Sequence, residues 1–249
     1  MIRKLSCALP ALAILLLAAC GAADDSPAER AEKNYMPFIR AALEELDRRA
    51  SPEATSYETF PFDHAYSYPG PTEEQEELYG RDDGYTDAGD EYLAAIGDLV
   101  AANLPRDAYA YDQYRYIACF VSQCMDYDNA GKAGLASVTP RGAILGGKAV
   151  CLGYTNSFLY LCERCDLWCA PITGYASWNG EEHGWNMVKL ADGTYYVDVT
   201  WCDQIGATIG SEGWESYFML TEEALTADHG VWTGGPATGK TVFLLKPAA

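Results

Sequence analysis

Two alternating segments near residue 192 constrain the fold of this 249-residue chain more than any other feature. The segments HGWNMVKL (183–190) and TYYVDVTW (194–201) flank Asp192-Gly193. Asp-Gly between two alternating runs is a strong signal for a β-hairpin with a two-residue turn. Because strand side chains alternate between the two faces, parity places His183 and Asp198 on the same face of the sheet. The chain is therefore expected to contain an antiparallel sheet.

The expected turn also fixes which residues face each other across the hairpin. With Asp192 and Gly193 as the two turn residues, Val188 pairs with Val197 on an apolar face and Met187 pairs with Asp198 on the opposite face. His183 then lies four residues from the point opposite Asp198, about 13 Å along a flat strand. The two side chains meet only if strong twist or a bulge closes that distance.

Helical spacing of apolar residues precedes the hairpin. It is found over 36–49, 90–103 and 109–127, and a further helix begins at Cys151. One more strand-like stretch, 167–176, lies between that helix and the hairpin. Helices in the first part of the chain and strands in the second predict an α+β fold.

The N-terminus has the pattern of a secretory signal. Arg3 and Lys4 precede an apolar run from Ala8 to Ala19, which is too short to span a bilayer stably. The run ends in "LAAC", which resembles the bacterial lipobox, so Cys20 is the expected lipidation site and first mature residue. The alternative is an ordinary signal peptide followed by a coincidental cysteine. We expect a lipid-anchored protein on the extracytoplasmic face of the cell membrane, extracellular or periplasmic.

Charge narrows the range of partners. The chain carries a formal net charge of −19, and removal of Arg3 and Lys4 with the signal makes it more negative. Such a protein repels nucleic acid, so a nucleic-acid partner is not expected. The acidic balance suits either solubility or a cationic partner, and the sequence leaves the oligomeric state open.

The cysteines leave several redox states open. Of nine, Cys7 leaves with the signal and Cys20 takes lipid, so seven remain in a disulfide-permissive compartment. An odd number means that at least one is free or pairs between chains. Cys162 and Cys165 form a CxxC pair, which we interpret as packed thiols. The pair lies near a helix C-terminus, where redox activation is not expected, and three histidines offer few zinc ligands. Neither a metal nor a cofactor is expected.

Cys151, His183 and Asp198 together are chemically complete for acyl transfer. The reactive form of cysteine is the thiolate, which a helix N-terminus and a neighbouring imidazolium stabilise. Cys151 has the first by position and His183 would supply the second. Asp198 would hold the other imidazole nitrogen and fix the tautomer. Gly147, just before the helix, would let a substrate backbone approach closely.

The motifs GGKAVCLGYTNSF, HGWN and YYVDVTW, in this order, resemble the transglutaminase-like superfamily of papain-like folds. The resemblance covers about 106–232 and includes SYFMLTEEALTADHGVW (216–232) as a terminal segment. It implies a helix carrying the cysteine packed on an antiparallel sheet carrying His and Asp. It also implies that Cys151 is the nucleophile, His183 the base and Asp198 the residue that orients it. The chain departs from the family where Cys202 stands between Thr-Trp and Asp203.

The domain organisation that follows has four parts. They are a lipoprotein signal peptide (1–19), a flexible tether (20–35), a helical and irregular N-terminal extension (36–105) and a transglutaminase-like catalytic domain (106–249). Within the extension, residues 50–87 show no sustained period and read as a long irregular connection with one helical turn at TEEQEELY.

Three classes of function remain open. The first is a cysteine peptidase or amidase acting on protein or cell-wall peptides; the second is a cross-linking transglutaminase; the third is a non-catalytic binding module. Trp185, Gly147 and Trp201 are the candidate substrate-binding residues, although both tryptophans equally suit a core. Gln123, Tyr116 and Tyr127 are unranked candidates for the side chain that completes an oxyanion hole. His229 is expected to be structural.

Overall fold

The computed structural model describes residues 25–48, 68, 70, 71, 73, 76, 77, 87–204 and 208–234. The predicted signal peptide (1–19) and the lipidation site Cys20 lie outside these residues, as does most of the irregular stretch 50–87. Of the helical turn expected at TEEQEELY, residues 73, 76 and 77 are described and are helical. No helix in the described ranges is long and apolar enough to cross a membrane.

The first helix, α2 (Pro27–Asp47), corrects the predicted tether. Residues 27–35, expected to be flexible, are helical. The helix begins early because Ser26 and Glu29 form a capping box. The Ser26 side chain accepts a hydrogen bond from the Glu29 backbone N–H, and the Glu29 carboxylate accepts one from the Ser26 N–H. Ala31 and Tyr35 are buried, so this first part of α2 belongs to the core.

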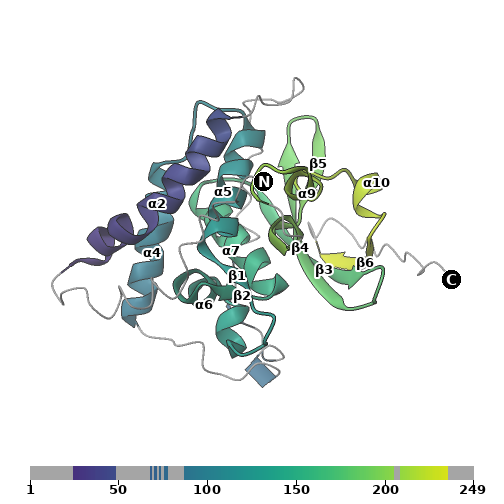
Figure 1. Ribbon diagram of the computed structural model, residues 1–249, viewed down its shortest axis with the longest axis horizontal. Helices are drawn as coiled ribbons and strands as arrows, with labels where there is room; N and C mark the ends of the chain where they lie inside the picture. Colours follow the sequence, from purple (N-terminus) through teal and green to yellow (C-terminus); the bar gives the residue numbers. More distant parts are fainter. Residues whose placement is uncertain are drawn as a thin grey trace, which may run out of the picture.

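Three more long helices pack with α2. They are α4 (Asp87–Ala102), α5 (Ala110–Cys124) and α7 (Cys151–Arg164), close to the predicted helices. Helix α7 contacts α4 and α5 on one side and strands β3 and β4 on the other, so it lies between the helices and the sheet (Figure 1). One hydrophobic cluster joins α2 and α4 to α5, α7 and the sheet. The expected N-terminal extension and catalytic domain therefore share a core.

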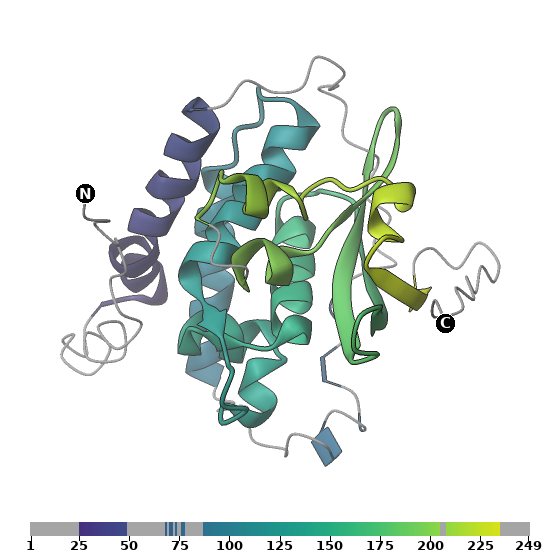
Figure 2. The same ribbon diagram turned by 45° about the vertical axis from the view of Figure 1, so that its right-hand side comes forward.

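The main sheet is antiparallel and has the strand order β5-β4-β3-β6. Its strands are β3 (Cys169–Ala176), β4 (Glu182–Leu190), β5 (Gly193–Val197) and β6 (His229–Gly234). Strands β3, β4 and β5 follow the predicted strands, whereas β6 was not predicted as a strand. Figure 2 shows β6 at the edge of this sheet. Mixed helices with an antiparallel sheet and a helical N-terminal region confirm the predicted α+β class.

Short elements complete the fold. Before α7 come β1 (Asp126–Tyr127), the 3₁₀ helix η2 (Gly134–Ser137), α6 (Pro140–Gly146) and β2 (Lys148–Ala149). After β5 come α8 (Val199–Gln204), α9 (Glu212–Glu215) and α10 (Glu222–Leu225).

The hairpin between β4 and β5 has a different register from the predicted one. Leu190 pairs with Gly193 and Val188 pairs with Tyr195, so Gly193 belongs to the strand and the turn residues are Ala191 and Asp192. The shift is two positions, which keeps the same side chains on each face. This register brings Asp198, the residue after β5, closer to His183 than the predicted register does. The expected 13 Å separation was therefore wrong because the turn comes earlier in the chain.

Candidate active site

Cys151 is the first residue of α7, the helix that packs on β3 and β4. Val150 before it is extended and caps the helix without a side-chain hydrogen bond. The Val150 carbonyl accepts from the N–H groups of Gly153 and Tyr154, while the Val150 N–H donates to Ser137. The N–H groups of Cys151 and Leu152 come earlier in the helix, where no carbonyl of the same helix can reach them. This end of α7 therefore offers backbone donors beside the thiol.

Cys151 also differs from the other thiols in exposure. All seven cysteines of the described residues are free, and Cys151 is the one that is not fully buried. Burial raises the pKa of Cys119 and of Cys165 to about 12. Burial likewise raises the pKa of Cys162 within the CxxC pair, so the two thiols of that pair are packed and unreactive, as the sequence predicted. Cys151 is the thiol best placed to react with a molecule from solvent.

A close helix contact at Gly153 holds Cys151 in place. A Cβ atom at Gly153 would lie 2.1 Å from the backbone oxygen of Ser137 and 2.9 Å from Cβ of Ala149. The Gly153→Ala variant is therefore expected to lower the free energy of unfolding by about 3 kcal/mol, because the backbone of η2 must move. Urea unfolding measures this change. Gly146→Ala is the matched control, since a Cβ there meets nothing within 4 Å. Equal stability of the two variants would contradict the contact.

His183 approaches α7 because a glycine follows it. Strand β4 packs on α7, and a Cβ on Gly184 would lie 3.1 Å from both Leu152 and Thr155 of that helix. Without the side chain, strand and helix lie close enough for His183 to reach the thiol of Cys151. Cys151 is among the groups whose interaction with the His183 ring raises the pKa of His183.

Asp198 lies at the junction of β5 and α8 rather than within the strand, which corrects the prediction that the sheet itself carries it. Its Oδ2 is 2.7 Å from Nε2 of His183, and its Oδ1 accepts a hydrogen bond from the backbone N–H of Trp201 at 3.1 Å. Its own N–H donates to the carbonyl of Tyr217. Asp198 is completely buried, so the carboxylate is held on all sides by donors.

His183 and Asp198 each stabilise the charged form of the other. Burial alone would lower the pKa of His183, but the charge and hydrogen bond of Asp198, with smaller contributions from Cys151, raise it to about 10. Burial alone would raise the pKa of Asp198, but His183 and then His229 hold it far below its ordinary value. His183 is therefore a cation and Asp198 an anion at neutral pH. Because Nε2 of His183 faces Asp198, Nδ1 is the ring nitrogen left to interact with the Cys151 thiol.

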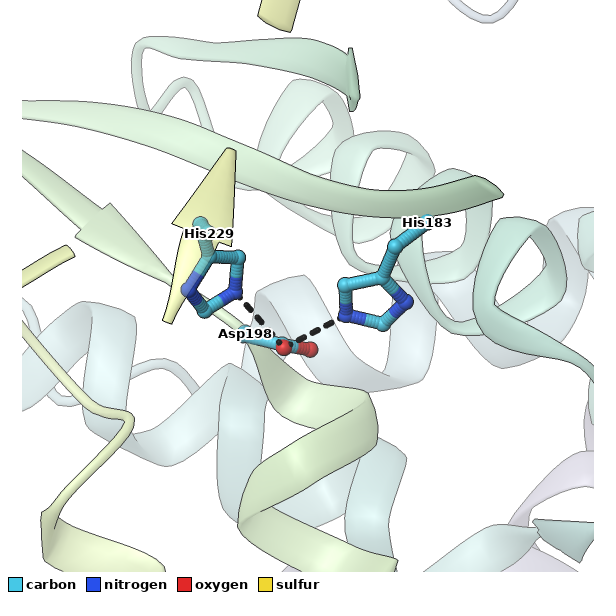
Figure 3. Close-up of side chains that lie close together, drawn as sticks. All are labelled: His183, Asp198 and His229. Carbon is cyan, nitrogen blue, oxygen red and sulfur yellow. Dashed lines mark hydrogen bonds and ion pairs between the residues drawn. The ribbon is translucent and has the colours of Figure 1, made fainter. Parts of the chain in front are cut away.

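A second imidazole binds the same carboxylate. Nε2 of His229, the first residue of β6, lies 3.2 Å from Oδ2 of Asp198, so the two rings flank one oxygen (Figure 3). Within the described residues, His183, Asp198 and His229 are the group whose atoms could hold a metal ion. The separations of 2.7 and 3.2 Å are those of N–H···O hydrogen bonds. A metal would have to displace the protons of both bonds.

The predicted substrate-binding residues lie in different environments. Trp201 is 5% exposed and stacks on His183, with the rings 4.5 Å apart. Trp178, which the sequence did not single out, is 62% exposed and covers Trp201 at 4.4 Å. Trp185 is only 1% exposed and packs edge-on against His229, so it fills the core behind the site. Gly147 is buried and ends α6 at φ +67°, which makes it a helix cap.

The oxyanion-hole candidates are also separated by the structure. The hydroxyl of Tyr116 donates to the carbonyl of Val100 and is buried there. Tyr127 belongs to β1, which pairs in parallel with β2 so that Tyr127 lies opposite Ala149, two residues before Cys151. Gln123 lies in the last turn of α5. Of the three, Tyr127 is brought next to the segment that leads into Cys151.

No protein-family model matches the chain. No curated protein matches it either. Among solved structures, it is similar to a proposed cysteine protease from Cytophaga hutchinsonii, with 13% sequence identity and a TM-score of 0.38. The match covers 63% of this chain, and the chain spans 56% of the length of that structure.

The structure thus brings together the three residues that the sequence proposed and adds two that it did not. Cys151, His183 and Asp198 come from α7, from β4 and from the end of β5. His229 was expected to be structural and Trp178 was not considered. The signal for His229 was the adjacent acid in Asp228-His229, since two neighbouring titratable residues in an otherwise apolar segment need partners when buried.

Proposed function

We propose that this protein is a thiol hydrolase of the transglutaminase-like type, a peptidase or amidase that cleaves amide bonds in peptides or proteins through Cys151. One observation carries the proposal. A half-buried thiol at a helix N-terminus interacts with an imidazole whose other nitrogen is held by a buried carboxylate. This is the arrangement that thiol acyl transfer requires.

The chemistry follows from the protonation states. His183 keeps the proton of Cys151 on Nδ1, and the thiolate attacks the carbonyl carbon of the substrate. The backbone N–H groups of Cys151 and Leu152 donate to the oxyanion of the tetrahedral intermediate. That intermediate collapses as His183 gives its proton to the leaving amine, and an acyl-enzyme remains. His183 then takes a proton from water, which attacks the thioester and releases the acid.

Hydrolysis is favoured over cross-linking by an exposed tryptophan beside the site. Transamidation needs water to be kept away from the acyl-enzyme. Trp178, which covers Trp201 beside His183, is 62% exposed. Because this side chain at the border of the site is exposed, water can reach the acyl-enzyme and hydrolyse it to a free acid. Incorporation of an added amine instead of water is the result that would reassign the protein as a transglutaminase.

Location is proposed from the sequence. The lipobox-like "LAAC" indicates a protein tethered through Cys20 to the outer face of the membrane, with peptide or protein substrates outside the cytoplasm. Mass spectrometry of the mature N-terminus tests this: diacylglyceryl on Cys20 supports the anchor, and an unmodified N-terminus elsewhere refutes it.

The decisive test compares Cys151 alkylation in the wild type and in His183→Gln. Exposure alone would let iodoacetamide label Cys151, so a variant that keeps exposure but loses the imidazole is the necessary control. Because the pKa of His183 is raised to about 10, we expect an imidazolium beside the thiol at pH 6 and a wild-type thiol that stays reactive there. An ordinary thiol with a pKa near 8.5 loses about 99% of its thiolate there. In His183→Gln we expect the labelling rate at pH 6 to fall about 100-fold.

Peptide mapping after alkylation identifies the labelled residue, and incubation with peptide libraries identifies the product. New peptide termini support a peptidase, and ammonia release without new termini supports an amidase. If Cys151 reacts equally in wild type and His183→Gln at every pH, the site is not activated and the chain is a binding module.

A further inference from the structure

His229 is held between two carboxylates at the back of the proposed catalytic group. Its Nε2 lies 3.2 Å from Oδ2 of Asp198, and its Nδ1 lies 2.7 Å from Oδ1 of Asp228. The hydroxyl of Tyr217 donates to Oδ2 of Asp228 at 2.9 Å. His229 itself is completely buried. Figure 3 shows its ring on the opposite side of Asp198 from His183.

The hydrogen-bond partners of the two ring nitrogens indicate the charge of His229. A neutral imidazole has one donor nitrogen, whereas the two carboxylates on either side of this ring are acceptors. Both contacts are satisfied only when both nitrogens carry protons. Burial by itself would lower the pKa of His229, but its hydrogen bonds to Asp198 and Asp228 and their charges raise it above the ordinary value. The ring is therefore an imidazolium.

We propose that His229 is a positioning residue for the thiol chemistry, which keeps Asp198 ionised and oriented so that Asp198 holds His183 in the protonated state beside Cys151. The inference rests on the proposed function, because it concerns the same reacting thiol. Nothing in it requires His229 to touch substrate.

The geometry separates this role from simple packing. A buried histidine that only fills space can satisfy its nitrogens with backbone groups, but here Nε2 shares Oδ2 of Asp198 with His183. With donors from His183, His229 and the Trp201 N–H, the carboxylate cannot rotate without breaking a bond. The rings of Trp185 and Trp201 lie 4.6 and 4.1 Å from the His229 ring and fix its plane.

The titratable groups that face His229 define what a pH measurement would report. They come from four places: Asp198 after β5, Asp228 just before β6, His183 on β4 with its ring 5.7 Å away, and Tyr217 after α9. Two anions thus surround two cations. Removing the His229 charge leaves Asp198 with His183 as its one cationic partner. The Asp198 carboxylate, which orients His183, is then held less firmly.

The test measures the rate of Cys151 alkylation by iodoacetamide from pH 5 to 9, with peptide mapping, in wild type, His229→Gln and Asp228→Asn. Glutamine keeps a donor toward Asp198 but loses the charge. We expect His229→Gln to lower the rate at pH 6 about tenfold, the effect of one weakened charged hydrogen bond. At pH 9 the rate should match wild type, because the thiolate then forms without help.

Asp228→Asn keeps an acceptor for Nδ1 of His229 and removes only a charge whose side chain is 29% exposed. We therefore expect a smaller change in the same direction, about threefold at pH 6. Asp192→Asn, at an exposed turn residue between β4 and β5, serves as the charge-matched control and should show the wild-type profile. A purely structural His229 would change the melting temperature but not the pH dependence of Cys151.

The outcomes distinguish this inference from the proposed function. If wild-type Cys151 already lacks reactivity at pH 6, the proposed function is refuted, and the positioning role of His229 is refuted with it. If the wild type is reactive and both variants keep its pH profile, only the role of His229 is refuted. If His229→Gln does not fold, Asp228→Asn decides: a shift toward higher pH supports the role, and an unchanged profile overturns it.

Discussion

Replacing Cys151 with alanine should abolish turnover of the peptide substrate while leaving the fold intact. Loss of a nucleophile that works with a base is expected to lower kcat by about 10⁶-fold. Cys151 is half-buried at the first position of α7, where alanine fits and no hydrogen bond of the helix is lost. The melting temperature should therefore change by less than about 2 °C. Steady-state kinetics and a thermal melt of the same preparation measure both effects.

Two further cysteine variants sharpen that experiment. Cys151→Ser keeps the shape, but an imidazole that stabilises a thiolate does not ionise a hydroxyl, so turnover should fall nearly as far. Cys165→Ala removes a buried thiol at the other end of the same helix, and should reduce stability without reducing kcat. Turnover of Cys151→Ala within 100-fold of wild type would show that another group performs the chemistry.

The second large effect is expected for Asp198→Asn, with a loss of about 10⁴-fold in kcat. Asp198 accepts hydrogen bonds from Nε2 of His183, Nε2 of His229 and the N–H of Trp201. An asparagine offers one oxygen in place of two, and its amide nitrogen can only donate. With that amide nitrogen turned toward Nε2, His183 carries its proton on Nδ1 and can no longer accept a proton from Cys151.

Stability and rate should separate in this variant. The low pKa of Asp198 means that its carboxylate stabilises the fold at pH values above its ordinary range, and that this contribution is lost as the pH falls. Asp198→Asn should therefore unfold more easily at pH 7 and lose this acid sensitivity. Urea unfolding at pH 3 and pH 7, beside kcat and KM, provides the comparison, because the contribution of Asp198 is lost only below its ordinary pKa. A folded variant with near-normal kcat would remove Asp198 from the mechanism.

Local chemistry made much of this architecture predictable. Apolar spacing located α4, α5 and α7 because a helix must bury one face, and alternation located β3, β4 and β5 for the same reason in a sheet. The start of α2 was missed because a charged, small-residue stretch such as 27–35 looks like a tether unless the capping box at Ser26 and Glu29 is recognised.

Register and distance were less predictable. Asp-Gly favours a turn, but pairing of Gly193 with Leu190 adds one more ladder contact to the sheet and moves the turn to Ala191 and Asp192. That choice depends on how the whole sheet packs on α7, which a local motif does not contain. Trp185 has the same limitation, since alternation gives the face on which it lies but not whether another layer covers that face.

The sequence by itself determined the types and order of the reacting groups: a cysteine opening a helix, a histidine near the start of a strand and an aspartate on the same face of the next strand-like segment. Those assignments depend only on local propensity and parity. The tertiary structure alone decided that Asp198 is shared by two imidazoles and that Trp178 covers Trp201. Such contacts join residues 15 to 31 positions apart, and their energy comes from burial and charge that arise only when the layers close around them.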